Sequence, residues 1–81
     1  MKIAYHPNFK KNLNKFSARI QKKADKQISY LSSRLFHPSL RAKKYDEGRG
    51  IWQARVDKSV RFYFIIEGDR YVLLDIKYHP K

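Results

Sequence analysis

Four residues in the C-terminal third of the chain carry groups that could act on a phosphodiester: Arg55, Arg61, Tyr63 and His79. The guanidinium fork of arginine matches phosphate oxygens, tyrosine stacks on bases, and histidine moves protons near neutral pH. RNA cleavage through the 2′-hydroxyl needs a base, an acid for the leaving 5′-oxygen, and cations for the charge that develops on phosphorus. The four residues together are therefore a candidate site for RNA cleavage.

Further basic and aromatic residues are candidates for contacting RNA: Arg41, Lys43, Lys44, Arg49 and Tyr78. A second interpretation stays open, because charged residues and tyrosine are also what a solvated sheet surface usually carries. Spacing alone does not separate a binding surface from a solvated one.

The candidate site falls within three apolar-alternating runs, residues 51–57, 58–67 and 68–79, which are typical of β-strands. Successive side chains of a strand point to opposite faces, so residues of one parity share a face. An even-numbered apolar set is expected to face the core: Ala54, Val56, Val60, Phe62, Phe64, Ile66, Val72, Leu74, Ile76 and Tyr78. An odd-numbered polar set is expected on the other face: Gln53, Arg55, Arg61, Tyr63, Asp75, Lys77 and His79. Five large residues are expected in or against the core: Trp52, Phe62, Phe64, Leu74 and Ile76.

Two three-residue hairpin loops, residues 57–59 and 68–70, would keep this alternation in register. They pair Val56 with Val60 and Glu67 with Tyr71, so that both hairpins preserve the face assignment. Glycine at the first position of such a loop is unusual, which leaves room for a bulge near Gly68.

The N-terminal half is expected to form a strand and two helices that support the sheet. Lys2 to Tyr5 reads as an edge strand, and apolar residues then recur at spacings of three and four through Leu35. A single helix over residues 8–35 would measure roughly 42 Å at about 1.5 Å per residue, which exceeds the diameter of a domain of this size. Ser17 is the best candidate cap for a second helix, folded back on the first. With a short edge strand at 41–45, the fold class is α+β, with the helices on one face of the sheet.

Composition limits the class of protein further. The 81 residues are expected to form one domain, 1–81, and the net charge of +12 favours a polyanionic or acidic partner. The absence of cysteine and the scattered histidines predict no metal site and no cofactor. With no signal peptide and no long apolar run, we expect a soluble cytoplasmic protein without membrane contact.

The chain resembles the RelE/ParE superfamily of small bacterial toxins. The resemblance rests on the element order, the HPxL segment of residues 37–40, the W-x-x-R-V run that begins at Trp52 and the R-x-x-F that begins at Arg61. It implies a toxin that is monomeric alone, forms a hetero-oligomer with an acidic antitoxin, and cleaves mRNA on the ribosome without a metal. The ParE-like branch implies instead a DNA gyrase inhibitor, and an inactive RNA-binding relative is a third alternative.

The same resemblance implies roles for individual residues. Arg61 matches the arginine that supports the scissile phosphate, and Arg55 falls on a strand position that is often basic. His79 resembles the terminal histidine that takes part in acid–base chemistry. No carboxylate matches the general base of the YoeB-like branch, so the base stays open, with Lys44 and Lys77 as the lysine alternative.

Overall fold

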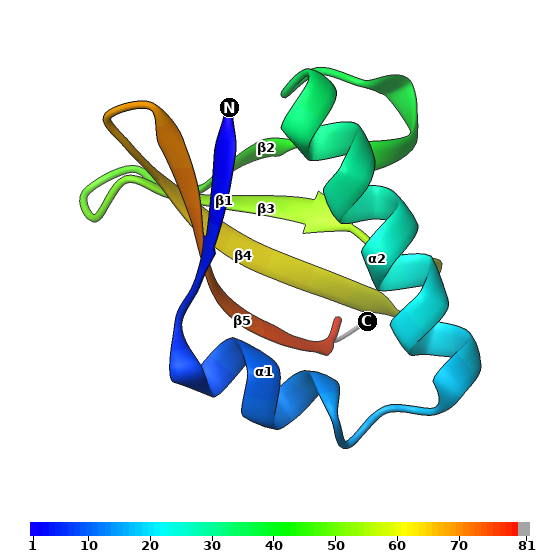
Figure 1. Ribbon diagram of the computed structural model, residues 1–81. Coiled ribbons are helices and arrows are strands. Elements are labelled where there is room, and N and C mark those ends of the chain that lie inside the picture. The colour runs from blue at the N-terminus through cyan, green and yellow to red at the C-terminus, as the bar shows by residue number, and fades with distance from the viewer. Residues whose placement is uncertain (80–81) are drawn as a thin grey trace.

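The computed structural model describes residues 1–79 as a five-stranded sheet supported by two α-helices (Figure 1). The elements follow in this order: β1 (Lys2–Tyr5), α1 (Pro7–Leu13), α2 (Ala18–Ser33), the 3-10 helix η1 (Pro38–Leu40), β2 (Lys43–Asp46), β3 (Ile51–Arg55), β4 (Val60–Glu67) and β5 (Arg70–Tyr78). The sheet order is β1-β5-β4-β3-β2, with β1 parallel to β5 and the other neighbours antiparallel. The expected α+β architecture is confirmed.

Side-chain caps start each helix at the position that the sequence favours. The imidazole of His6 accepts a hydrogen bond from the amide of Asn8, and Pro7 opens α1. Ser17 caps α2, because its hydroxyl accepts from the amide of Ile20 at 3.3 Å. The predicted break at Ser17 is therefore confirmed.

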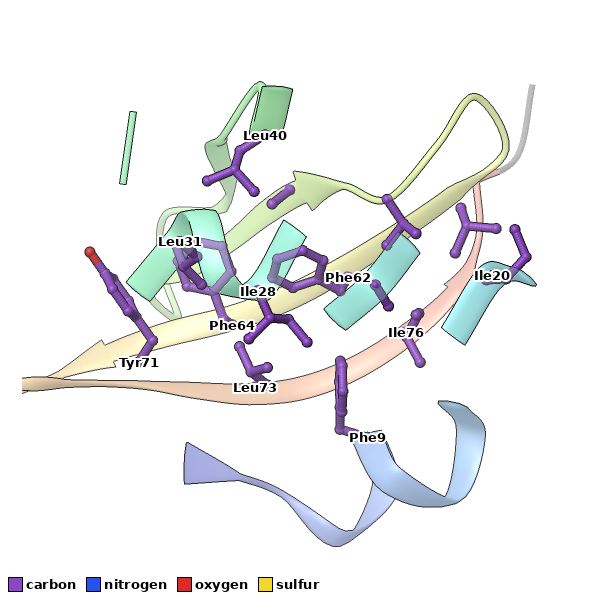
Figure 2. Packing of buried hydrophobic residues seen from close by; sticks show 14 residues of the cluster. Phe9, Ile20, Ile28, Leu31, Leu40, Phe62, Phe64, Tyr71, Leu73 and Ile76 are labelled. Carbon is purple, nitrogen blue, oxygen red and sulfur yellow. The ribbon is translucent and has the colours of Figure 1, made fainter. Parts of the chain in front are cut away.

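The core lies between α2 and one face of the sheet (Figure 2). Phe62 and Phe64 of β4 are fully buried there, and Phe9 of α1 meets Phe62 edge to face at 6.4 Å between ring centres. Trp52 is half-buried and stacks on Phe64 at 6.3 Å, as expected for a residue at the margin of the core. The even-numbered face of β3 and of most of β4 therefore packs on the helices as predicted.

The hairpin between β3 and β4 has the predicted register. The amide of Val56 donates to the carbonyl of Val60 at 2.9 Å, and Arg55 pairs with Arg61. The Asp57 carboxylate accepts from the amides of Ser59 and Val60, which stabilises the intervening turn.

The hairpin between β4 and β5 differs from the prediction. Glu67 pairs with Arg70, so the loop is the two-residue turn Gly68–Asp69, with Gly68 at a φ of 61°. The register then shifts between the pairs Phe64–Leu73 and Tyr63–Asp75, which leaves Leu74 as the extra residue of a β-bulge. A bulge was anticipated near Gly68, but it lies at Leu74.

Because of the bulge, the side chains in the first part of β5 face the opposite side of the sheet from the predicted one. Tyr71 and Leu73 are buried in the core, whereas Val72 and Leu74 are only half-buried, so the parity prediction is wrong for residues 70–74. Beyond the bulge Ile76 is buried as predicted, because the extra residue restores the original parity. Ile66 and Tyr78, also assigned to the core face, are largely exposed.

The bulge coincides with a change of neighbour along β5. The pairing of β1 with β5 ends at Leu73, whose carbonyl accepts from the amide of His6 at 2.8 Å. Beyond that point α1 runs beside β5, and Asn12 donates to the carboxylate of Asp75 at 2.6 Å (Figure 1). Among residues 1–79, no helix is both long and apolar enough to cross a bilayer.

Candidate active site

A basic pocket of about 200 Å³ opens on the sheet face opposite α2, and we call it the arginine pocket. Six residues line it: Arg41, Lys43, Gln53, Arg55, Arg61 and His79. None of the six is acidic, and four of them carry a permanent positive charge. A site of this composition attracts an anion of phosphate size.

Arg55 and Arg61 stand directly opposite each other on β3 and β4. Like charges in this position repel each other. Burial, and after it the facing Arg55, lower the pKa of the Arg61 guanidinium. A bound phosphate would relieve this repulsion, because one anion can lie between the two cations.

The turn between β3 and β4 fixes both Arg61 and His79. The Nη1 atom of Arg61 donates to the backbone carbonyls of Asp57 and Val60. The amide of His79 donates to the carbonyl of Ser59 at 2.7 Å, which joins the chain after β5 to the same turn. The guanidinium is therefore held in place before any ligand binds, with its other nitrogens left for an anion.

Arg41 enters the pocket from a strained backbone. Its φ of 47° makes it the one non-glycine residue of the described range in the left-handed region. This conformation ends η1 and leads the chain into β2. Strain of this kind at a ligand-facing residue is typical of functional sites.

Gln53 lines the pocket, and its odd-numbered position predicts the correct face, but it was not among the predicted site residues. Gln53 is 5% exposed, and its carboxamide forms no hydrogen bond to another of residues 1–79. No side-chain nitrogen or oxygen in this range is both fully buried and without a partner, so the amide of Gln53 is not sealed from solvent, and Gln53 lines the pocket. The sequence feature that could have indicated Gln53 is an amide between two apolar residues, in a strand whose other face packs on the core.

Tyr63 lies beside the pocket under two neighbouring side chains. Its ring meets that of Tyr45 at 4.8 Å, and the ammonium of Lys77 lies 5.0 Å from its ring centre. Burial, with a smaller contribution from Tyr45, raises the pKa of the Tyr63 phenol. Since Tyr63 is 5% exposed, Tyr45 offers the more accessible ring to a base.

Three of the predicted contacts lie away from the arginine pocket. Lys44 pairs with Trp52, and its ammonium lies 5.8 Å from the indole ring centre, on the helix side of the sheet. Arg49 is in the turn after β2, where it forms an ion pair with Asp46 at 3.6 Å. Tyr78 is 68% exposed but packs against Phe16, 5.0 Å between ring centres. Lys77 is opposite Arg61 in β5 but is not part of the pocket wall.

The two carboxylates closest in sequence to the site already have partners. Asp57 accepts from the turn amides, and Asp75 accepts from Asn12 and from the amide of Ile76. Within the described part of the chain, no three histidine, aspartate or glutamate side chains gather in a way that could hold a metal ion. Among the six residues that line the pocket, His79 and Lys43 carry groups that can exchange a proton.

Comparison with solved structures places this fold among bacterial and archaeal toxins. A YoeB/ParE toxin from Agrobacterium tumefaciens superposes with a TM-score of 0.82 at 17% identity, over 99% of this chain and 100% of that one. The YoeB dimer from Staphylococcus aureus superposes with a TM-score of 0.82 at 14% identity, over 99% of this chain and 98% of that one. The RelB-RelE antitoxin-toxin complex from Methanococcus jannaschii superposes with a TM-score of 0.76 at 18% identity, over 93% of this chain and 88% of that one.

At this level of identity the comparison establishes a shared fold. The chain has the fold of the YoeB and RelE toxins of toxin–antitoxin systems along almost its whole length. No protein-family model matches the sequence. No curated protein matches it in sequence either.

Proposed function

We propose that this protein is the toxin of a toxin–antitoxin pair and that it cleaves mRNA on the ribosome in the cytoplasm. The observation that carries the proposal is the arginine pocket, in which four permanent cations and His79 surround a space suited to one phosphate. The fold shared with YoeB and RelE toxins supports the same assignment.

In the proposed reaction the 2′-oxygen of one ribose attacks the neighbouring phosphorus. The new bond from this oxygen to phosphorus forms as the bond to the 5′-oxygen breaks, leaving a 2′,3′-cyclic phosphate and a free 5′-hydroxyl. The 2′-hydroxyl proton goes to a base, and the 5′-oxygen receives a proton from an acid. Arg61 and Arg55 balance the charge on the nonbridging oxygens, and His79 exchanges a proton with one of the two ribose oxygens.

An acidic antitoxin is the proposed protein partner. The net charge of +12 calls for a partner of opposite sign, since a small domain with this charge repels itself. Similar folds occur in a YoeB-YefM complex from Staphylococcus aureus and in the RelB-RelE complex. Binding over the arginine pocket would block access of the phosphate.

The test is a cleavage assay with purified ribosomes carrying a defined mRNA. Primer extension should reveal cuts at a constant position within the codon, and free mRNA should be cut far more slowly. The Arg61→Ala variant serves as the inactive control. Intact mRNA, together with DNA breaks when the protein is added to DNA gyrase, would contradict the nuclease assignment in favour of gyrase inhibition.

A further inference from the structure

Gln27 of α2 is a nearly buried polar residue, 7% exposed, that the proposed cleavage reaction does not use. It lies in the wall of a second hollow of about 500 Å³, which we call the Gln27 pocket. Six residues line this hollow: Gln27, Pro38, Ser39, Arg41, Arg55 and Val56. Because Arg41 and Arg55 belong to both walls, the two pockets adjoin.

The carboxamide of Gln27 has a fixed orientation. Its Nε2 atom donates to the carbonyls of Ser39 at 2.9 Å and Arg55 at 2.7 Å, which uses both hydrogens of the amide. The reverse orientation would place Oε1 against two carbonyl oxygens, so the assignment of nitrogen and oxygen is determined by chemistry. The side chain can therefore offer only an acceptor to a ligand.

The Oε1 atom of Gln27 is free to accept. No donor within residues 1–79 reaches it, and no buried side-chain oxygen of this range is sealed away without a partner. The atom is therefore not fully buried, and its side chain forms part of the wall of the hollow.

We propose that the Gln27 pocket receives the nucleobase next to the phosphate in the arginine pocket, and that Gln27 Oε1 accepts a hydrogen bond from an N–H of this base. The inference rests on the proposed function, which makes RNA the ligand. Arg41 and Arg55 hold the strand where it passes from one pocket to the other. A second phosphate is disfavoured at Gln27, because its oxygens would face an acceptor.

The proposal makes Gln27 a specificity residue whose effect depends on the base. One hydrogen bond of this kind changes affinity roughly 2- to 10-fold. A purely structural role, in which Gln27 only joins α2 to η1 and β3, would affect all bases equally.

The experiment measures binding of dinucleotides that cannot be cleaved because the 2′-oxygen is methylated. Adenine is compared with purine, the same ring system without the amino group, at the 5′ position and separately at the 3′ position. The parent chain should bind adenine roughly 2- to 10-fold more tightly at one position. In Gln27→Met that ratio should fall to about one, since methionine keeps the length of the side chain without its acceptor.

Gln21→Met is the matched control, because Gln21 lies on the same helix and donates to the carbonyl of Phe16 at 2.9 Å. It should keep the parental preference for adenine. If Gln27→Met does not fold, the comparison of adenine with purine in the parent chain tests the inference on its own. Equal affinities at both positions, or no detectable binding of any dinucleotide, would overturn the inference. An adenine preference without mRNA cleavage would instead overturn the proposed reaction and leave the base site standing.

Discussion

Arg55 and Arg61 face each other across β3 and β4, with both side chains in the wall of one pocket. The pairing of two like charges costs stability in the free protein, and burial adds to the cost at Arg61. The arrangement is understandable if a phosphate normally lies between the two side chains.

Replacing one member of this pair should stabilise the free protein. Arg55→Gln should raise the free energy of unfolding by about 0.2–1 kcal/mol at low ionic strength, the size of a cross-strand charge effect. In 1 M sodium chloride the gain should shrink, because the screening length falls to about 3 Å. Urea titrations at both salt concentrations measure this, with Lys23→Gln on the exposed side of α2 as the control. A loss of stability at low salt would contradict the repulsion.

Arg61 and His79 should act together in mRNA cleavage. Loss of the preorganised cation in Arg61→Ala should lower the rate about 10²- to 10³-fold, and loss of the proton-transfer group in His79→Ala about 10²- to 10⁴-fold. Arg61→Lys should also be slow, since an ammonium cannot replace the planar fork. The rates are measured on ribosomes, with circular dichroism to verify folding. Near-parental cleavage by both alanine variants would redirect attention to Lys77, Tyr63 and Lys44.

The bulge in β5 predicts losses of stability of different size at two neighbouring leucines. Leu73→Ala should cost about 2–5 kcal/mol, because Leu73 is fully buried against the core. Leu74→Ala should cost clearly less, since this side chain is half-buried on the other face. Chemical denaturation of both variants checks this, with Phe64→Ala, expected to cost about 3–5 kcal/mol, as a positive control. A larger loss for Leu74→Ala would place the bulge elsewhere.

Two buried tyrosines should make the protein sensitive to alkali. Burial raises the pKa of Tyr63 and of Tyr71 above 10.0, so each phenol binds its proton more tightly in the folded state. This contribution to stability is complete below pH 10 and is lost as the pH rises through the raised folded values. The tyrosinate absorbance of Tyr63 and Tyr71 should therefore rise only above pH 10, together with a fall in stability. Six tyrosines that titrate together near pH 10 in a folded protein would contradict the burial.

Arg41 should be replaceable by glycine with a gain in stability and a loss of activity. Glycine adopts the positive φ without the steric cost, which is worth roughly 0.5–1 kcal/mol after its greater chain entropy is counted. The same change removes one cation from the arginine pocket and should slow cleavage. Thermal unfolding and the ribosome assay measure the two effects, and Arg41→Ala separates them by removing the charge while keeping the strain.

The local pattern of the sequence determined most of the elements. Ser17 has a capping hydroxyl at the point where one long helix would outgrow the domain, and the structure confirms the break there. Alternation in β3 and β4 placed Arg55 and Arg61 together, because strand side chains follow a strict period of two. Both predictions depend on rules that act within a few residues.

Only the tertiary structure decided which side chains of β5 face the core and which residues line the arginine pocket. The parity of β5 reverses at Leu74, where β1 stops pairing and α1 takes its place beside Asp75. Neither neighbour is visible in the local sequence of β5. Lys43 and Lys44 are chemically equivalent in the sequence, yet pairing with Gln53 and with Trp52 sends them to opposite faces. Gln27 reaches β3 from a helix 28 residues earlier, a contact that only packing creates.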